Sequence, residues 1–251
     1  MFERISDNIY IRPYMHYTDR PNIGLICGSH RALLYDAGNS SDHAALLQRE
    51  LKDGQLPFPD YIALSHWHWD HSFGAHGWDV PVIAGKATND QLRSMTGWKW
   101  DDDSMDGRAQ RGEDIVFCNE MIRREYPDRS KIRIVPADIV FEDRLTLDLG
   151  DLECELIHAR GPHSRDSVIC HIPSEKFLFL GDSNGKDLYG LPWHFDIEHE
   201  EDFLPTTMAL PYDKNLVNAY LRLLDTLDFS HCIGGHGDLM TRDELYRSLT
   251  G

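Results

Sequence analysis

The chain is short of positive charge: 25 Lys and Arg stand against 42 Asp and Glu, which gives a formal net charge of −17 over 251 residues. Proteins that bind nucleic acid or anionic membranes non-specifically need a basic surface to neutralise phosphates or lipid headgroups. We therefore expect neither a nucleic-acid partner nor a membrane partner. A local positive site is still compatible with this composition, and a bound metal ion is one way to create it.

Three further features are absent. No run approaches the roughly 18 apolar residues of a membrane-spanning helix, and the alternating N-terminus MFERISDNIYIRP lacks the apolar segment of a signal peptide. The five cysteines are scattered and never spaced as CxxC. That pattern favours buried free thiols in a reducing compartment over a disulfide framework. We expect a cytoplasmic globular protein.

No internal repeat or Pro/Ser-rich linker divides the chain, so we expect residues 1–251 to form a single domain. Short apolar or alternating runs predict strands in two β-rich halves, each followed by helices. In the first half, the predicted strands are 8–12, 22–27, 32–35, 61–64 and 80–84. In the second half they run from IRIV at 132–135 to 181, with a short strand at 232–234. Two sheets packed face to face with helices outside accommodate this order, as do other layered α/β arrangements.

One segment interrupts the helical periodicity between the halves. Residues 97–112 contain a run of acids and three glycines, and they predict a solvated loop. Helical spacing resumes from Ile115 to Tyr126 and ends at Pro127. We treat 97–130 as a candidate lid insertion.

The motif HWHWDH at residues 66–71 directly follows a compact apolar strand. Alternate residues of an extended segment share a face, so His66 and His68 can point at one ion. Asp70 and His71 lie where the chain must turn, and can face a second ion or its water. Imidazoles with a carboxylate suit zinc, iron or manganese. A single histidine is usually structural, but this dense cluster indicates a metal site.

Three later residues of ligand type also come directly after predicted strands: His163, Asp182 and His236. Functional sites gather at strand ends, because the sheet holds the side chains while the loops stay open to substrate. The repetition at successive strand ends strengthens the metal interpretation. The other histidines have no such spacing, and we expect them to be structural.

With HxHxDH followed by a His, an Asp and a His, each after its own strand, the sequence resembles the metallo-β-lactamase superfamily. Asp36 in LLYDAG matches the Asp that supports the metal loop in that family. The matching positions run from Asp36 to His236 and cover most of the chain. The resemblance implies an α/β fold, an αβ/βα four-layer sandwich with the site at one edge.

The resemblance also implies a dinuclear centre, which we expect to hold two Zn²⁺, with Fe or Mn as alternatives. Carried over one by one, the ligand positions are metal 1 (His66, His68, His163), metal 2 (Asp70, His71, His236) and a bridging Asp182. Zinc lowers the pKa of a bound water to about 7. A shared hydroxide would then attack an electrophilic carbon or phosphorus, with Asp70 as the candidate catalytic proton shuttle.

This sequence departs from the patterns of individual branches of the superfamily, and these differences narrow the range of possible reactions. True β-lactamases of this fold typically have Cys or Ser where this chain has Asp182. Glyoxalase II continues with a helical domain, whereas 15 residues follow His236 here. Acyl-homoserine lactonases carry a Tyr where Gly185 stands, and Tyr189 is the nearest substitute. We expect hydrolysis of an ester, lactone or thioester-like bond in a small molecule.

Other functions stay open. Persulfide dioxygenases of this fold hold one iron with residues equivalent to His66, His163 and Asp182, so a mononuclear iron oxidoreductase is one alternative. A phosphodiesterase is another, although nuclease branches usually add a large insert or a basic exosite. A non-catalytic binder is disfavoured, because all seven ligand positions are intact. The sequence does not define the oligomeric state.

Side chains that could contact a substrate lie near the predicted ligands or in loops. The aromatic and histidine candidates are Trp69, Trp193, His194 and Tyr189. Trp98 and Trp100, beside the acidic segment, would belong to the lid. Arg165 and Lys186 could hold an anionic group of a substrate, although such charges are most often solvated.

Overall fold

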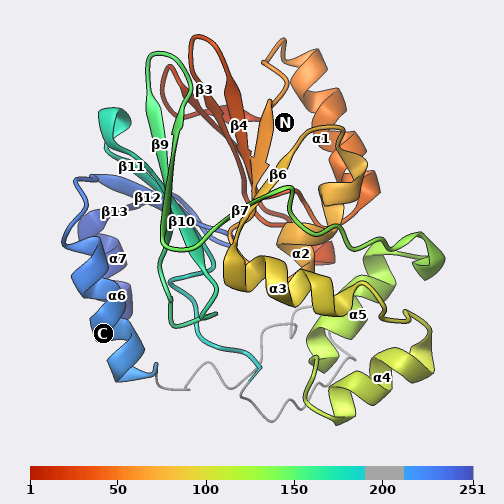
Figure 1. The fold of residues 1–251 in the computed structure, drawn as a ribbon. Coiled ribbons are helices and arrows are strands. Elements are labelled where there is room, and N and C mark those ends of the chain that lie inside the picture. Colours follow the sequence, from red (N-terminus) through yellow and green to blue (C-terminus); the bar gives the residue numbers. More distant parts are fainter. Residues whose placement is uncertain (190–211, 251) are drawn as a thin grey trace.

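Two β-sheets face each other, with helices on both outer sides (Figure 1), in a computed structural model that describes residues 1–189 and 212–250. The predicted αβ/βα four-layer sandwich is confirmed. Among the described residues, none of the helices combines the length and the apolar character that a membrane crossing requires.

The first sheet contains seven strands in chain order. They are β1 (Glu3–Arg4), β2 (Ile9–Arg12), β3 (Ile23–Cys27), β4 (Ala32–Tyr35), β5 (Tyr61–Ala63), β6 (Val82–Gly85) and β7 (Ile139–Phe141). Neighbours from β1 to β4 pair antiparallel, and neighbours from β4 to β7 pair parallel. Because β4 and β5 run parallel, the residues that follow them emerge at the same edge of the sheet.

The second sheet contains six strands in the order β13-β12-β11-β10-β9-β8. They are β8 (Arg144–Asp148), β9 (Glu153–His158), β10 (Val168–Ile172), β11 (Phe177–Gly181), β12 (His231–Gly234) and β13 (Met240–Thr241). Among the described strands of this sheet, β11 and β12 pair parallel and the other neighbours pair antiparallel. The ends of β11 and β12 therefore also lie side by side.

The outer layers consist of helices whose apolar faces pack on the sheets. α1 (Ser41–Asp53) and α3 (Lys86–Met95) cover the first sheet, while α6 (Lys214–Leu224) and α7 (Arg242–Thr250) cover the second. Ser40 caps α1, accepting a hydrogen bond from the His43 amide at 2.9 Å. The other described helices are α2 (Trp69–Ser72), α4 (Asp102–Gln110), α5 (Val116–Glu125) and the 3₁₀ helices η1 (His16–Thr18), η2 (Phe73–Gly77), η3 (Arg129–Lys131) and η4 (Pro173–Glu175). Of these, η4 forms the turn between β10 and β11, at the end of the sandwich away from the site.

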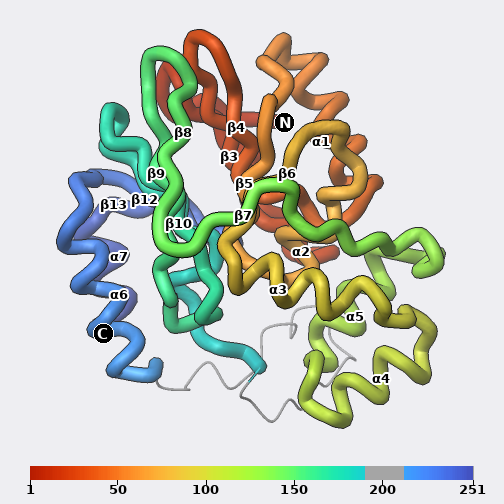
Figure 2. Tube along the Cα trace, in the orientation of Figure 1, coloured from red at the N-terminus to blue at the C-terminus, as the bar shows by residue number. Residues whose placement is uncertain are grey.

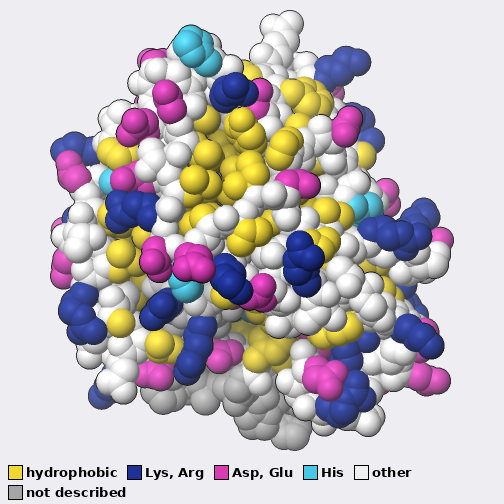
Figure 3. Space-filling view, in the orientation of Figure 1, with side chains coloured by type: hydrophobic (Ala, Val, Ile, Leu, Met, Phe, Trp, Pro, Cys, Tyr) yellow, Lys and Arg dark blue, Asp and Glu magenta, His cyan; other side chains and the backbone are white. Residues whose placement is uncertain are grey.

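The core between the sheets ties the two halves of the chain together. The rings of Tyr35 and Phe179 lie 5.5 Å apart, and the Tyr35 hydroxyl donates to the Val168 carbonyl at 2.6 Å. Hydrophobic side chains reach the surface between the sheets in Figure 3, where the edge strands β7 and β8 lie.

Two sequence-based expectations are wrong. Residues 97–112 are not a loop throughout, because α4 forms within them, capped by Asp101, which accepts from the Ser104 amide at 3.0 Å. Burying Met105 in an apolar cluster stabilises this short helix despite its acids. Residues 132–135 form no strand: their apolar side chains pack into two clusters without pairing to a sheet.

The loops that carry the predicted ligands meet at one end of the sandwich. Figure 2 shows α2, which follows β5, at the same end as the chain that leaves β11. The segment after β12 returns to this end too, because the Gly235 amide donates to the Gly181 carbonyl at 2.7 Å. Strand ends that are distant in sequence are thus brought together.

Candidate metal centre

Seven predicted ligand residues lie together at this end, in two groups. In each group the donor atoms all lie within 4.8 Å of one another. The first group contains His66, His68 and His163, and the second contains Asp70, His71, Asp182 and His236. All seven are buried or half-buried.

The first group consists of imidazoles alone. His68 Nδ1 and His163 Nε2 lie 3.0 Å apart. His66 Nε2 is buried and has no hydrogen-bond partner among the described residues, while its Nδ1 lies 3.0 Å from Ser65 Oγ. A buried donor atom without a partner is costly unless a ligand satisfies it. This group therefore fits a cation that prefers nitrogen ligands.

Two imidazoles of the first group, those of His66 and His68, are held in their uncharged form. Burial, reinforced by neighbouring His163, lowers the pKa of His68 to about 3. Burial and the neighbouring His68 also hold the pKa of His66 well below its usual range. Neutral imidazole is the form that binds metal. A cation therefore need not displace a proton from either of these two side chains at neutral pH.

The second group combines two carboxylates with two imidazoles. Asp70 Oδ2 lies 2.9 Å from His71 Nε2 and 3.0 Å from His236 Nε2. Burial would raise the pKa of the Asp70 carboxyl, but His71 and His236 outweigh burial and lower it. Asp70 is therefore ionised at neutral pH and can accept a proton or bind a cation.

Asp182 lies between the two groups. One carboxylate oxygen is 3.5 Å from His71 Nε2, and the other is 3.6 Å from His163 Nε2. Gly235 leaves the space for this carboxylate, because a Cβ there would lie 2.1 Å from Asp182 Oδ1. Every side chain larger than hydrogen at 235 would clash with Asp182, so Gly235 has a steric role at the site.

A further shell of polar contacts orients the imidazoles. Asp36, after β4, accepts from the Ser65 amide at 2.7 Å and contacts His71 Nδ1 at 2.7 Å. The Lys186 carbonyl lies 2.7 Å from His163 Nδ1. Each contact fixes one ring nitrogen and directs the other into the centre.

Asp19 was not found from the sequence. It follows η1 in the left-handed conformation, at φ 53°, and its Oδ1 lies 3.7 Å from His236 Nδ1. Burial, reinforced by the nearby Asp70, raises the pKa of its carboxyl to about 7. The only sequence signal is a turn of the type TDRP, which marks a bend but not a site.

The predicted substrate-binding residues have different surroundings. Trp69 is buried in an apolar cluster against Phe73, with ring centroids 6.3 Å apart. The Tyr189 ring stacks on His68 at 5.1 Å, and its hydroxyl lies 3.3 Å from Asp114 Oδ1. Trp193 and His194 lie outside the described residues.

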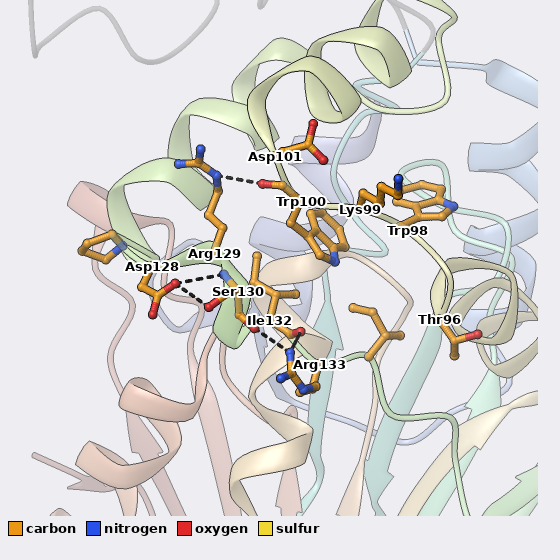
Figure 4. Close-up of a pocket in the computed structure, with 12 residues that line it drawn as sticks. Thr96, Trp98, Lys99, Trp100, Asp101, Asp128, Arg129, Ser130, Ile132 and Arg133 are labelled. Carbon is orange, nitrogen blue, oxygen red and sulfur yellow. Dashed lines mark hydrogen bonds between the residues drawn. The ribbon is translucent and has the colours of Figure 1, made fainter.

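Trp98 and Trp100 line a separate pocket of about 620 Å³. Figure 4 shows their indole rings along one side of it, with Arg129 and Ser130 across from them. None of the seven candidate ligands lines this pocket. The buried Arg108 guanidinium lies over both rings, 4.4 and 4.7 Å from the ring centroids, so these tryptophans help to hold α4 in place.

Comparisons with known proteins agree with this geometry. A family model described as the metallo-beta-lactamase superfamily matches residues 17–231. The acyl-coenzyme A thioesterase MBLAC2 of Homo sapiens is 26% identical over 181 residues, covering 65% of this chain and 58% of the relative. The chain thus spans less than two thirds of that protein. The MBLAC2 of Gallus gallus is 27% identical over 243 residues, covering 91% and 76%.

The fold has counterparts among solved structures. A metallo-beta-lactamase from Pontibacter korlensis superposes with a TM-score of 0.66 at 19% identity, covering 100% of this chain and 97% of that one. At this identity, the likeness concerns the fold alone.

Proposed function

Since the chain belongs to the metallo-beta-lactamase superfamily, we propose that it is a dinuclear metal-dependent hydrolase of an ester, lactone or thioester bond in a small molecule. The observation that carries this proposal is the meeting of seven side chains, from four segments of the chain that each follow a strand, in two adjacent groups of donor atoms. A binding or scaffold protein has no need of such a buried cluster of ligand-type groups.

The donor atoms support two zinc ions. The first group offers three imidazoles, a ligand set that occurs in catalytic zinc sites. The second offers two imidazoles and two carboxylates, and Asp182, whose oxygens face His71 and His163, would contribute to holding both ions. An anionic bridge reduces the repulsion between two dications. When bound, the cations would activate a water molecule and polarise the scissile carbonyl.

The chain itself supplies a proton carrier. Asp70 Oδ2 lies within 3.0 Å of both His71 Nε2 and His236 Nε2. An ionised carboxylate at this position can take a proton from the attacking water and pass it to the leaving group. We assign this role to Asp70.

Among the three bond types, the thioester is favoured. Relatives that match this chain are named acyl-coenzyme A thioesterases, in Homo sapiens and Gallus gallus. They are 26% and 27% identical to this chain, so thioesterase activity is proposed for it on the basis of this similarity.

The cytoplasmic location and the lid role of 97–130 stay predictions.

Metal analysis and a substrate panel test the proposal together. The protein is purified without added metal, its metal content is measured by mass spectrometry, and lactone, thioester, phosphodiester and persulfide substrates are supplied. We expect two zinc ions per chain and hydrolysis of the thioester. One iron with oxygen consumption would support the dioxygenase alternative instead, and no metal with no turnover would support a binding protein.

A matched pair of variants ties the activity to the centre. His236 follows β12 and belongs to the second group, whereas His231 begins the same strand and is exposed. We expect His236→Ala to lose most of the activity and part of the metal. His231→Ala should keep both.

A further inference from the structure

A pocket of about 470 Å³ adjoins the first group of candidate ligands. His68 and His163 are among its lining residues, so a molecule in this pocket can reach the centre with one end. Trp67, Tyr189 and Tyr212 line it as well and give it aromatic walls. The pocket therefore suits an elongated molecule with a reactive end and an apolar or amide-containing arm.

Two cationic side chains line the same pocket. Arg165 is exposed, and its guanidinium forms no ion pair with the residues the structure describes. Lys186 is half-buried, with its Nζ 5.3 Å from the centroid of the Tyr212 ring. They come from different loops, after β9 and after β11, and meet at this pocket.

Two carboxylates of the lining are engaged with the backbone. Asp213 Oδ1 caps α6, accepting from the Asn215 amide at 2.8 Å and the Leu216 amide at 3.3 Å. Asp187 Oδ1 accepts from the Tyr189 amide at 2.9 Å. The backbone amides and the start of α6 offset part of their negative charge. The pocket is thus less acidic than a protein of net charge −17 would lead one to expect.

We propose that Arg165 and Lys186 form an anion subsite that binds the phosphates on the thiol arm of a coenzyme A thioester. This inference rests on the proposed function and names its substrate class. A guanidinium binds phosphate oxygens in a bidentate fashion, and an ammonium adds a compact charge beside it. The arm lies along the aromatic walls, and the thioester carbonyl faces His68 and His163.

The reaction that this arrangement serves is thioester hydrolysis. The water oxygen forms a bond to the acyl carbon, the carbon–sulfur bond breaks, and the thiolate takes a proton. The products are a carboxylic acid and free coenzyme A. No oxidant or reductant takes part.

Paired substrates isolate the subsite from the chemistry. Acetyl- and octanoyl-CoA are compared with the corresponding pantetheine thioesters, which share the reacting bond and lack the phosphates. For wild-type protein we expect kcat/KM to favour the CoA thioester at least tenfold, and this preference to shrink as salt is raised, since salt screens exposed charges. The matching glutathione thioester, whose negative charges are carboxylates and which has no phosphate, should be the poorer substrate.

The variants then test the two side chains. We expect Arg165→Glu with Lys186→Glu to lower the CoA-to-pantetheine ratio at least tenfold. The Lys186 carbonyl stays available to His163, because only the side chain changes. Lys176→Gln is the control: it removes an exposed lysine at the opposite end of β11, where it pairs with Asp228 at 3.2 Å. That variant should keep the wild-type ratio.

A binding measurement separates the two proposals. Calorimetry with desulfo-CoA, which has no thiol to coordinate metal, should show binding to the metal-loaded wild type and at least tenfold weaker binding to the double variant. Thioester hydrolysis with an unchanged ratio and unchanged desulfo-CoA affinity would overturn the subsite alone. Weakened desulfo-CoA binding in a protein that hydrolyses nothing would support the subsite and overturn the hydrolase.

Discussion

Asp36 Oδ2 lies 2.7 Å from His71 Nδ1, and both side chains are fully buried. The same carboxylate accepts from the Ser65 amide through its other oxygen. One residue thus fixes both the backbone before HWHWDH and a ring within it. Carboxylate partners of this kind orient metal-ligating imidazoles and raise their basicity.

Replacing Asp36 should therefore weaken metal binding without removing a ligand. We expect Asp36→Asn to lower zinc affinity at the second group by about 10- to 100-fold, because the amide keeps one acceptor but loses the charge. Competition with a fluorescent chelator measures the two affinities. Asp60→Asn is the control, since Asp60 also accepts a backbone amide, from Ala32 at 2.8 Å, at the opposite end of β4 and β5. Equal losses in both variants would contradict the prediction.

Asp182 offers a test of the bridge. Its two oxygens face His71 and His163, which belong to different groups. We expect Asp182→Ala to reduce metal content from two ions toward one, because the repulsion between the cations is no longer offset. Mass spectrometry after gel filtration gives the stoichiometry, with Asp228→Ala as the exposed control. Two ions retained at full affinity would exclude the bridging role.

Protons should compete with metal more strongly at the second group. Burial lowers the pKa of His236, but Asp182 and Asp19 outweigh it and raise the pKa to about 9. A cation must displace that proton at every pH below 9, so affinity should fall by up to about tenfold per pH unit for each displaced proton. At the first group, His66 and His68 already lack a proton at neutral pH, and the dependence should be shallower.

Zinc affinities measured from pH 6 to 9 check this prediction. The two sites are separated by titrating the wild type and a His236→Ala variant that keeps the first group. A steeper slope for the site that contains His236 is expected. Equal slopes at both sites would show that the carboxylates do not hold a proton on His236 in the metal-free protein.

Much of this arrangement could be predicted from the sequence, because the decisive signals are local. Strand periodicity is read from neighbouring residues, and the runs at 22–27 and 32–35 are found as β3 and β4. The spacing of HWHWDH is also local. The family resemblance linked HWHWDH to His163, Asp182 and His236 as one predicted metal centre. The structure brings these residues together in two groups of donor atoms.

What could not be predicted depends on contacts across the fold. Met105 stabilises α4 by packing against residues far away in sequence, so the acidic composition of this segment was misleading. The apolar side chains of 132–135 pack into two hydrophobic clusters, and this segment does not pair with a strand. Asp19 approaches His236 only because the turn after η1 folds over the second group. No pattern among neighbouring residues of the sequence predicts these long-range contacts.

An ion pair whose carboxylate is buried links the insertion that contains α4 and α5 to the segment beside Asp19. Arg20 Nη2 lies 2.8 Å from Glu125 Oε1 at the end of α5, and Ser40 Oγ also donates to that carboxylate. Removing one partner of a buried pair leaves the other charge uncompensated. We expect Glu125→Gln to lower the free energy of unfolding by about 2–4 kcal/mol.

Urea denaturation measures this loss, and Glu120→Gln on the same helix provides the comparison. Glu120 pairs with Arg123 nearer to solvent, so its loss should cost less than about 1 kcal/mol. Because Arg20 directly follows Asp19, the Glu125 variant should also release the turn over His236. We therefore expect it to weaken zinc at the second group more than at the first. Equal losses of stability in both variants would show that the ion pair does not anchor α5, and the predicted link between the insertion and the centre would fall with it.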